Sequence, residues 1–97
     1  MTVQHLINDT PWADIVTYLS DMNEAEKKDI FSDLKVAENT LSHQAAELNA
    51  AYDANDENAV RNLEQEYGAP LQIICVRLGT VQRAINFLTS NWHTPHV

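Results

Sequence analysis

The chain has 97 residues, with 14 acidic and six basic side chains and a formal net charge of −8. Its hydrophobic content of 44% is ordinary for a globular protein, which argues against a disordered chain. Its length predicts a single helical domain over residues 1–97, with a modest core that oligomerisation would help to stabilise. Only two Gly and three Pro are present, and this scarcity of turn residues favours an all-α fold over an all-β one.

The charge is distributed unevenly along the chain. All 14 Asp and Glu lie in residues 1–66 with four basic residues, so that part carries 4 − 14 = −10, and residues 67–97 carry two Arg and no acid. The first part is therefore expected to face water and the second to be buried. Because a negative surface repels phosphate, direct binding to nucleic acid or to an anionic membrane is not expected.

The first expected helix spans residues 11–20, after a loose arm at residues 1–9. Thr10 is suited to be its N-cap, and Pro11 to be its first helical residue, where the missing N–H costs nothing. One apolar stripe with helical spacing follows, made of Trp12, Ile15, Val16 and Leu19.

A long second helix is predicted over residues 24–54. Asn23 and Glu26 have the spacing of a capping box at its start. Its apolar stripe consists of Ile30, Leu34, Ala37, Leu41, Ala45, Leu48 and Tyr52. Members of this stripe recur eleven residues apart from Leu34 onward, which is close to the period of an unstrained helix and predicts little supercoiling.

The polar segment 53–58 predicts a tight turn, with Asn55 or Asp56 as the cap of the next helix. So short a connection between two long helices implies an antiparallel helical hairpin. The returning helix is expected over residues 57–91, and residues 92–97 form a tail after it.

Gly68 and Pro70 interrupt this second long helix and form the predicted hinge. Pro70 cannot donate a backbone hydrogen bond, and Ala69 before it is disfavoured in helical geometry. Tyr67 and Leu71 are four residues apart, so the apolar face continues across the interruption. We therefore expect a kink or a one-residue break between two nearly collinear segments. The alternative is a full turn into a separate helix.

Residues 71–92 show an apolar face wider than one partner helix needs. Ile73, Val76, Ala84 and Phe87 extend it beyond the main stripe. Exposed apolar surface of this kind marks an interface, so we expect a homodimer that completes a four-helix bundle. The expected interface residues are Trp12, Leu71, Ile74, Leu78, Val81, Ile85, Leu88 and Trp92. Arg77 and Arg83 would pair with acids of the long helix or of a second chain.

No motif for catalysis or cofactor binding stands out, so we expect no catalytic residues, no cofactor and no metal. Cys75 lies in an apolar run that predicts a buried, inert thiol. His93 and His96 are expected to be solvated histidines of the tail, because two imidazoles alone do not make a zinc site. With no pattern of a signal peptide and no run of 18 apolar residues, a cytoplasmic protein without a membrane span is expected.

The long helix carries a predicted acidic face, made of Glu24, Glu26, Asp29, Asp33, Glu38 and Glu47. Acids one turn apart, such as Asp29 and Asp33, occur in all-α hydrolases that use magnesium, but those sites need a matching pair on a facing helix. The second helix offers no such pair. A solvated acidic surface is therefore expected, and a Mg-dependent hydrolase is the least favoured hypothesis.

The leading functional hypothesis is a non-catalytic interaction module that binds a partner protein, as an inhibitor, an adaptor or an assembly factor. It depends on the absence of catalytic motifs and on the wide apolar face. The alternative is an acidic mimic of nucleic acid, of the phage anti-defence type known from anti-CRISPR and anti-restriction proteins. Such a mimic would occupy the basic groove of a DNA- or RNA-binding enzyme.

Overall fold

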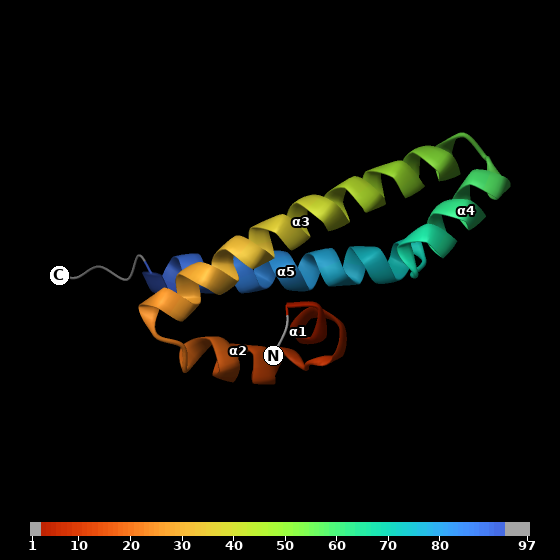
Figure 1. The fold of residues 1–97 in the computed structure, drawn as a ribbon. Helices are drawn as coiled ribbons and strands as arrows, with labels where there is room; N and C mark the ends of the chain where they lie inside the picture. Colours follow the sequence, from red (N-terminus) through yellow and green to blue (C-terminus); the bar gives the residue numbers. More distant parts are fainter. Residues whose placement is uncertain (1–2, 93–97) are drawn as a thin grey trace.

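The computed structural model describes residues 3–92, and these residues form five helices, which makes the fold all-α as predicted. Their bounds are α1 Val3–Asp9, α2 Trp12–Ser20, α3 Glu24–Asp53, α4 Glu57–Tyr67 and α5 Leu71–Trp92. The long helices α3 and α5 pack antiparallel, which confirms the predicted hairpin (Figure 1). The molecule is elongated, with extents of 54 × 24 × 19 Å.

The interface between α3 and α5 forms the main part of the core. Both stripes that the sequence predicts point into it, and the fully buried side chains include Leu34 and Leu48 of α3 and Ile74, Val81 and Leu88 of α5. The buried side of α3 differs from the predicted apolar stripe only at the end of the helix. There Ala51 is buried and Tyr52 is 48% exposed. Tyr52 therefore belongs to the surface and not to the predicted core.

Helix α3 begins as the sequence predicts. The Asn23 side chain accepts the Glu26 N–H at 2.8 Å, and the Glu26 carboxylate accepts the Asn23 N–H at 3.3 Å, which completes the capping box. At the other end, the Asp56 carboxylate accepts the Ala59 N–H at 3.0 Å and caps α4. The turn between them is made by Asn55, whose φ of 54° lies in the left-handed region that Asn tolerates well.

Residues 3–9 differ from the predicted loose arm, because they form helix α1. Leu6 is only 1% exposed, and α1 packs on both α3 and α5. Since seven residues are too few for a stable helix in water, this tertiary contact is what maintains α1. Residues 93–97, the predicted tail with His93 and His96, lie outside the described residues.

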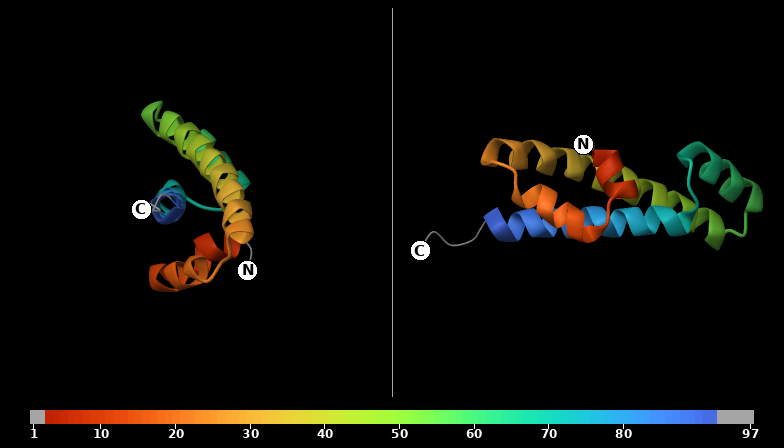
Figure 2. Two further views of the ribbon diagram at one scale, coloured as in Figure 1. Left: turned by 90° about the vertical axis from the view of Figure 1, so that its left-hand side faces the viewer. Right: turned by 90° about the horizontal axis from the view of Figure 1, so that it is seen from below.

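The start of α2 is shifted by one residue from the prediction. Pro11 is the N-cap, because its carbonyl accepts the N–H groups of Asp14 and Ile15, both at 3.0 Å. Thr10 does not cap α2, since its hydroxyl donates to the His5 carbonyl of α1 at 3.2 Å. Together α1 and α2 form a second layer beside α3 and α5, as the two views of Figure 2 show.

The predicted hinge is neither a kink nor a one-residue break, because the three residues 68–70 separate α4 from α5. Gly68 ends α4 with φ 71° and ψ 16°, the left-handed geometry that glycine adopts without steric cost. Pro70 precedes α5, and its carbonyl accepts the N–H groups of Ile73 and Ile74, both at 3.1 Å. Figures 1 and 2 show α4 at an angle to α5, so the two segments are less collinear than expected. Ala69 between them is buried, which anchors the break in the core.

The two glycines provide a matched pair of substitutions that tests this geometry. Gly68→Ala should lower the free energy of unfolding by about 1 kcal/mol, because an alanine at φ 71° is strained even with space for its Cβ. Gly79→Ala inside α5 should instead raise it by about 0.5 kcal/mol or more, since alanine is the better helix former and nothing lies within 4 Å of the new Cβ. Urea denaturation of both variants gives the two signs, and a stabilising Gly68→Ala would contradict the left-handed break.

A second substitution tests the docking of α1. Leu6→Ala should lower the free energy of unfolding by about 2–5 kcal/mol, the usual range for removing a buried leucine. The exposed neighbour Gln4 is the control, and Gln4→Ala should change the free energy by less than about 0.5 kcal/mol. Equal small effects in thermal denaturation would show that residues 3–9 do not pack on the core.

Candidate functional site

The predicted interface on α5 is largely used inside the chain. Ile74, Val81, Ile85 and Leu88 are buried in the core, and Leu71 and Leu78 are partly buried against it. Trp12 is also partly buried, and the Arg83 guanidinium lies 4.2 Å from the centroid of its ring, a cation–π contact. Trp92 ends α5, but its side chain lies outside the described part of the chain. Apart from Trp92, these side chains therefore lie in the core or are partly buried against it.

The apolar excess on α5 is smaller than the sequence suggested, because α1 and α2 cover part of it. Ala84 is buried and Phe87 is partly buried, whereas Ile73 and Val76 remain 41% and 62% exposed. The Cys75 thiol is exposed, contrary to the predicted buried thiol. Residues 73–76 are all apolar, but only one side of the helix faces the core, so Ile74 is buried and its neighbours are not.

The predicted acidic face is divided among local roles. Glu26 completes the capping box, Glu38 accepts from the Lys35 ammonium at 3.1 Å, and Glu47 contacts two other side chains. Glu24, Asp29 and Asp33 are exposed. Within residues 3–92 no group of three or more His, Cys, Asp or Glu is arranged to hold a metal ion, so Asp29 and Asp33 find no matching acids.

The acidic surface carries fewer negative charges per unit length than a DNA duplex does. DNA carries one negative charge per about 1.7 Å of its axis, so a duplex as long as the 54 Å protein would carry about 32 charges. The whole chain has 14 carboxylates and a net charge of −8. The protein therefore carries fewer than half as many acidic groups as a duplex of the same length.

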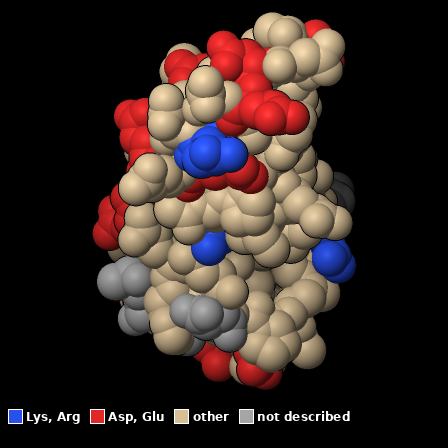
Figure 3. Space-filling model, turned by 90° about the vertical axis from the view of Figure 1, so that its right-hand side faces the viewer, with Lys and Arg blue, Asp and Glu red and all other residues tan. Residues whose placement is uncertain are grey.

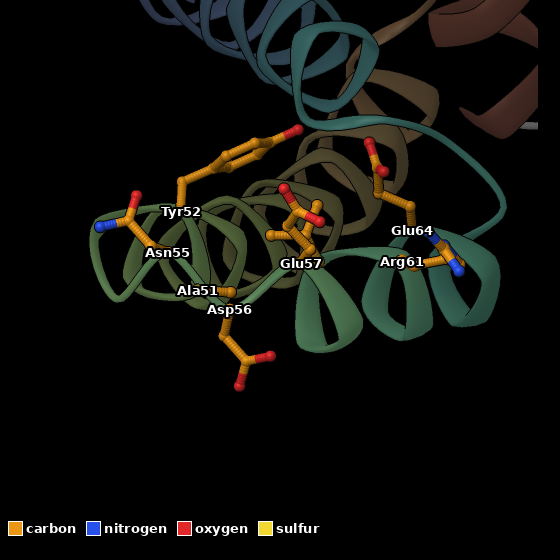
Figure 4. Close-up of a pocket in the computed structure, with 8 residues that line it drawn as sticks. Ala51, Tyr52, Asn55, Asp56, Glu57, Arg61 and Glu64 are labelled. Carbon is orange, nitrogen blue, oxygen red and sulfur yellow. The ribbon is translucent and has the colours of Figure 1, made fainter.

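One cleft lies where the end of α3 meets α4, and its volume is about 420 Å³ (Figure 4). It is lined by Ala51, Tyr52, Asn55, Asp56, Glu57, Val60, Arg61 and Glu64. In Figure 4 the Glu57 and Glu64 carboxylates point to the same side as the Tyr52 ring, whereas the Asp56 carboxylate points away. Figure 3 looks onto this end of the molecule and shows acidic side chains gathered over its upper part, where α3 and α4 lie.

The chemistry of the cleft is that of a site for a positively charged group. The half-exposed Tyr52 ring offers a π-face, and the Glu57 and Glu64 side chains line the same cleft. The side chain of Arg61 points away from Tyr52 in the same view. The sequence did not predict this cleft because it assigned Tyr52 to the core, whereas in the structure Ala51 is buried and Tyr52 is exposed.

A cluster of three side chains connects α3 to the end of α4. The Tyr67 hydroxyl donates to Glu47 Oε2, and His43 Nε2 lies 2.6 Å from Glu47 Oε1. The hydrogen bond to Glu47, together with burial and the nearby negative charges, raises the pKa of Tyr67 to about 12. This contact fixes the last residue of α4 immediately before the break at Gly68.

Comparison with known proteins gives no match to a family model, to a curated protein or to a solved structure. Within residues 3–92, none of the helices combines the length and the apolar character that a membrane crossing requires.

The raised pKa of Tyr67 predicts a defined pH dependence. Because the folded state holds this proton more tightly than the unfolded state, its contribution to stability is complete below pH about 10 and is lost as the pH rises through about 12. In a spectrophotometric titration, one tyrosine should ionise late in the wild type. The late step should be absent in Tyr67→Phe and should move to lower pH in Glu47→Gln.

The exposed Tyr52 supplies the control for this titration, because Tyr52→Phe should leave the late step unchanged. A late step that persists in Tyr67→Phe would assign it to another residue and contradict the hydrogen bond to Glu47.

Proposed function

We propose that this protein is a non-catalytic interaction module that binds a basic segment of a partner protein in the cleft between α3 and α4. The observation that carries the proposal is a cleft lined by the half-exposed Tyr52 ring and by the Glu57 and Glu64 side chains, which point to the same side. A lysine or arginine side chain seated there would gain a cation–π contact and opposite charge together. Binding of this kind suits an inhibitor, an adaptor or an assembly factor.

The charge of the chain supports the same class of partner. Residues 1–66 carry −10, and this field attracts a basic protein from a distance. A nucleic-acid-binding enzyme is one such basic partner, so inhibition of an enzyme of this type is the second candidate function. The sparse spacing of the carboxylates favours contact with a local cluster of basic side chains and not with the full length of a nucleic-acid groove.

The first test uses short lysine-rich and arginine-rich peptides and follows backbone NMR signals. We expect shifts that cluster at residues 51–64 and binding that weakens as salt is added. Tyr52→Ala, or Glu57→Gln together with Glu64→Gln, should weaken binding by about fivefold, the effect of losing a cation–π contact or two exposed charge pairs.

The matched control removes two carboxylates elsewhere on α3. Glu24→Gln together with Asp29→Asn changes the net charge equally but leaves the cleft intact, and it should have a smaller effect. If both double variants weaken peptide binding equally, the peptides are attracted by the total charge of the protein, and the cleft is not their binding site. A pull-down from the native host with the wild type and the Tyr52→Ala variant then identifies the partner by what only the wild type retains.

A further inference from the structure

A second concave surface lies between α1 and α3 and has a volume of about 330 Å³. Its apolar lining comes from two helices and consists of Val3, Ile7, Val36, Ala37 and Leu41. The polar lining includes Gln4, Thr40 and Gln44, with Tyr67 of α4 and one side chain of each charge, Asp33 of α3 and Arg77 of α5. We call this surface the α1–α3 groove. It is distinct from the α3–α4 cleft, with which it shares no lining residue.

Within the described residues, the two charges of the groove have no ion-pair partner. Among the residues that the structure describes, neither Arg77 nor Asp33 forms an ion pair, although the chain carries 14 carboxylates. Arg77 is partly buried, so part of the hydration of its side chain is lost. The sequence predicts an acid of the long helix or of a second chain as the partner of Arg77, and the described residues of the long helix do not provide one.

A groove that contains one charge of each sign can be complementary to itself. In an interface with two-fold symmetry, each contact between different residues occurs twice, once in each direction. Arg77 of one copy could therefore pair with Asp33 of a second copy, while Asp33 of the first pairs with Arg77 of the second.

The spacing along α3 is compatible with this exchange. When two α3 helices pack antiparallel and are centred on Ala37, residue 33 of one copy lies level with residue 41 of the other. Leu41 lines the same groove, so Asp33 of each copy would lie against the other copy's groove, which also contains Arg77. The eight residues from Asp33 to Leu41 correspond to about 12 Å of helix, which separates the two pairs along the axis.

The centre of such a pairing is apolar and has short side chains. Val36 is 66% exposed, which is the largest exposed fraction among the bulky apolar side chains that the structure describes. Ala37 and Thr40 beside it are small enough for two helices to approach to about 8–10 Å. The pairing would bury Val36 of both copies at its centre.

We propose that the α1–α3 groove is the contact surface of a symmetric homodimer, held by reciprocal pairs between Arg77 and Asp33 around Val36. This surface differs from the α5 stripe that the sequence suggests for dimerisation, because that stripe is buried in the chain's own core. The net charge of −8 on each copy opposes association, so the dimer forms at micromolar concentration and not below it. The proposal does not depend on the α3–α4 cleft.

A charge-swap experiment tests the reciprocal pairs. Sedimentation equilibrium of the wild type should show a monomer–dimer equilibrium over micromolar concentrations. Arg77→Glu alone, and Asp33→Arg alone, should each weaken dimerisation by about tenfold or more, because each substitution places two like-charged pairs in the interface. The double variant Arg77→Glu/Asp33→Arg should restore it.

Two controls separate a specific contact from total charge. Arg61→Glu and Asp53→Arg make the same changes of charge at exposed positions outside the groove, and each should leave the dimer intact. A wild type that stays monomeric throughout, a dimer unaffected by the single reversals, or a double variant in which dimerisation is not restored would each overturn the proposal.

Circular dichroism verifies that each variant is folded. Peptide binding at the cleft should persist in the groove variants, so the two proposals fail independently.

A crosslinking experiment locates the centre of the dimer. Val36→Cys, in a Cys75→Ser background that removes the one native thiol, should be joined to its symmetry mate by a short bismaleimide. Ala46→Cys is exposed on the same helix but lies away from the centre, and it should give little crosslinked dimer. Equal crosslinking at the two positions would overturn the proposed centre of the dimer.

Discussion

The packing of α3 against α5 is the contact on which the rest of the structure depends. Leu34 and Leu48 meet a stripe of side chains from α5 that are almost inaccessible to water. Neither α1 nor α4 is long enough to be stable by itself, so each depends on a surface that this pair provides. The cleft and the groove are both formed where a shorter helix packs beside α3 without covering it completely.

Much of the hairpin could be predicted from the sequence because its signals are local. The capping box of Asn23 and Glu26, the cap at Asp56 and the apolar periods of α3 and α5 each depend on residues a few positions apart. Gly68 and Pro70 also predicted the position of the interruption correctly, since glycine adopts a positive φ easily and proline cannot continue a helix.

The features that were missed depend on contacts between distant parts of the chain. Helix α1 is formed by packing that no periodicity in seven residues can show. Cys75 and Tyr52 look apolar in the sequence, but their exposure depends on which side of a helix meets a partner and where α3 ends. The cleft requires the geometry of the turn at Asn55, and the groove requires α1, so neither candidate site was predicted from the residues alone.

The contacts of α1 also fix an order of events during synthesis. Residues 3–9 leave the ribosome before the rest of the described chain, yet the helix they form packs on α3 and on α5, which ends at Trp92. A helix of seven residues has little stability before those surfaces exist. Residues 3–9 can therefore complete their contacts only after part of α5 has been made, although they are synthesised before the other described residues.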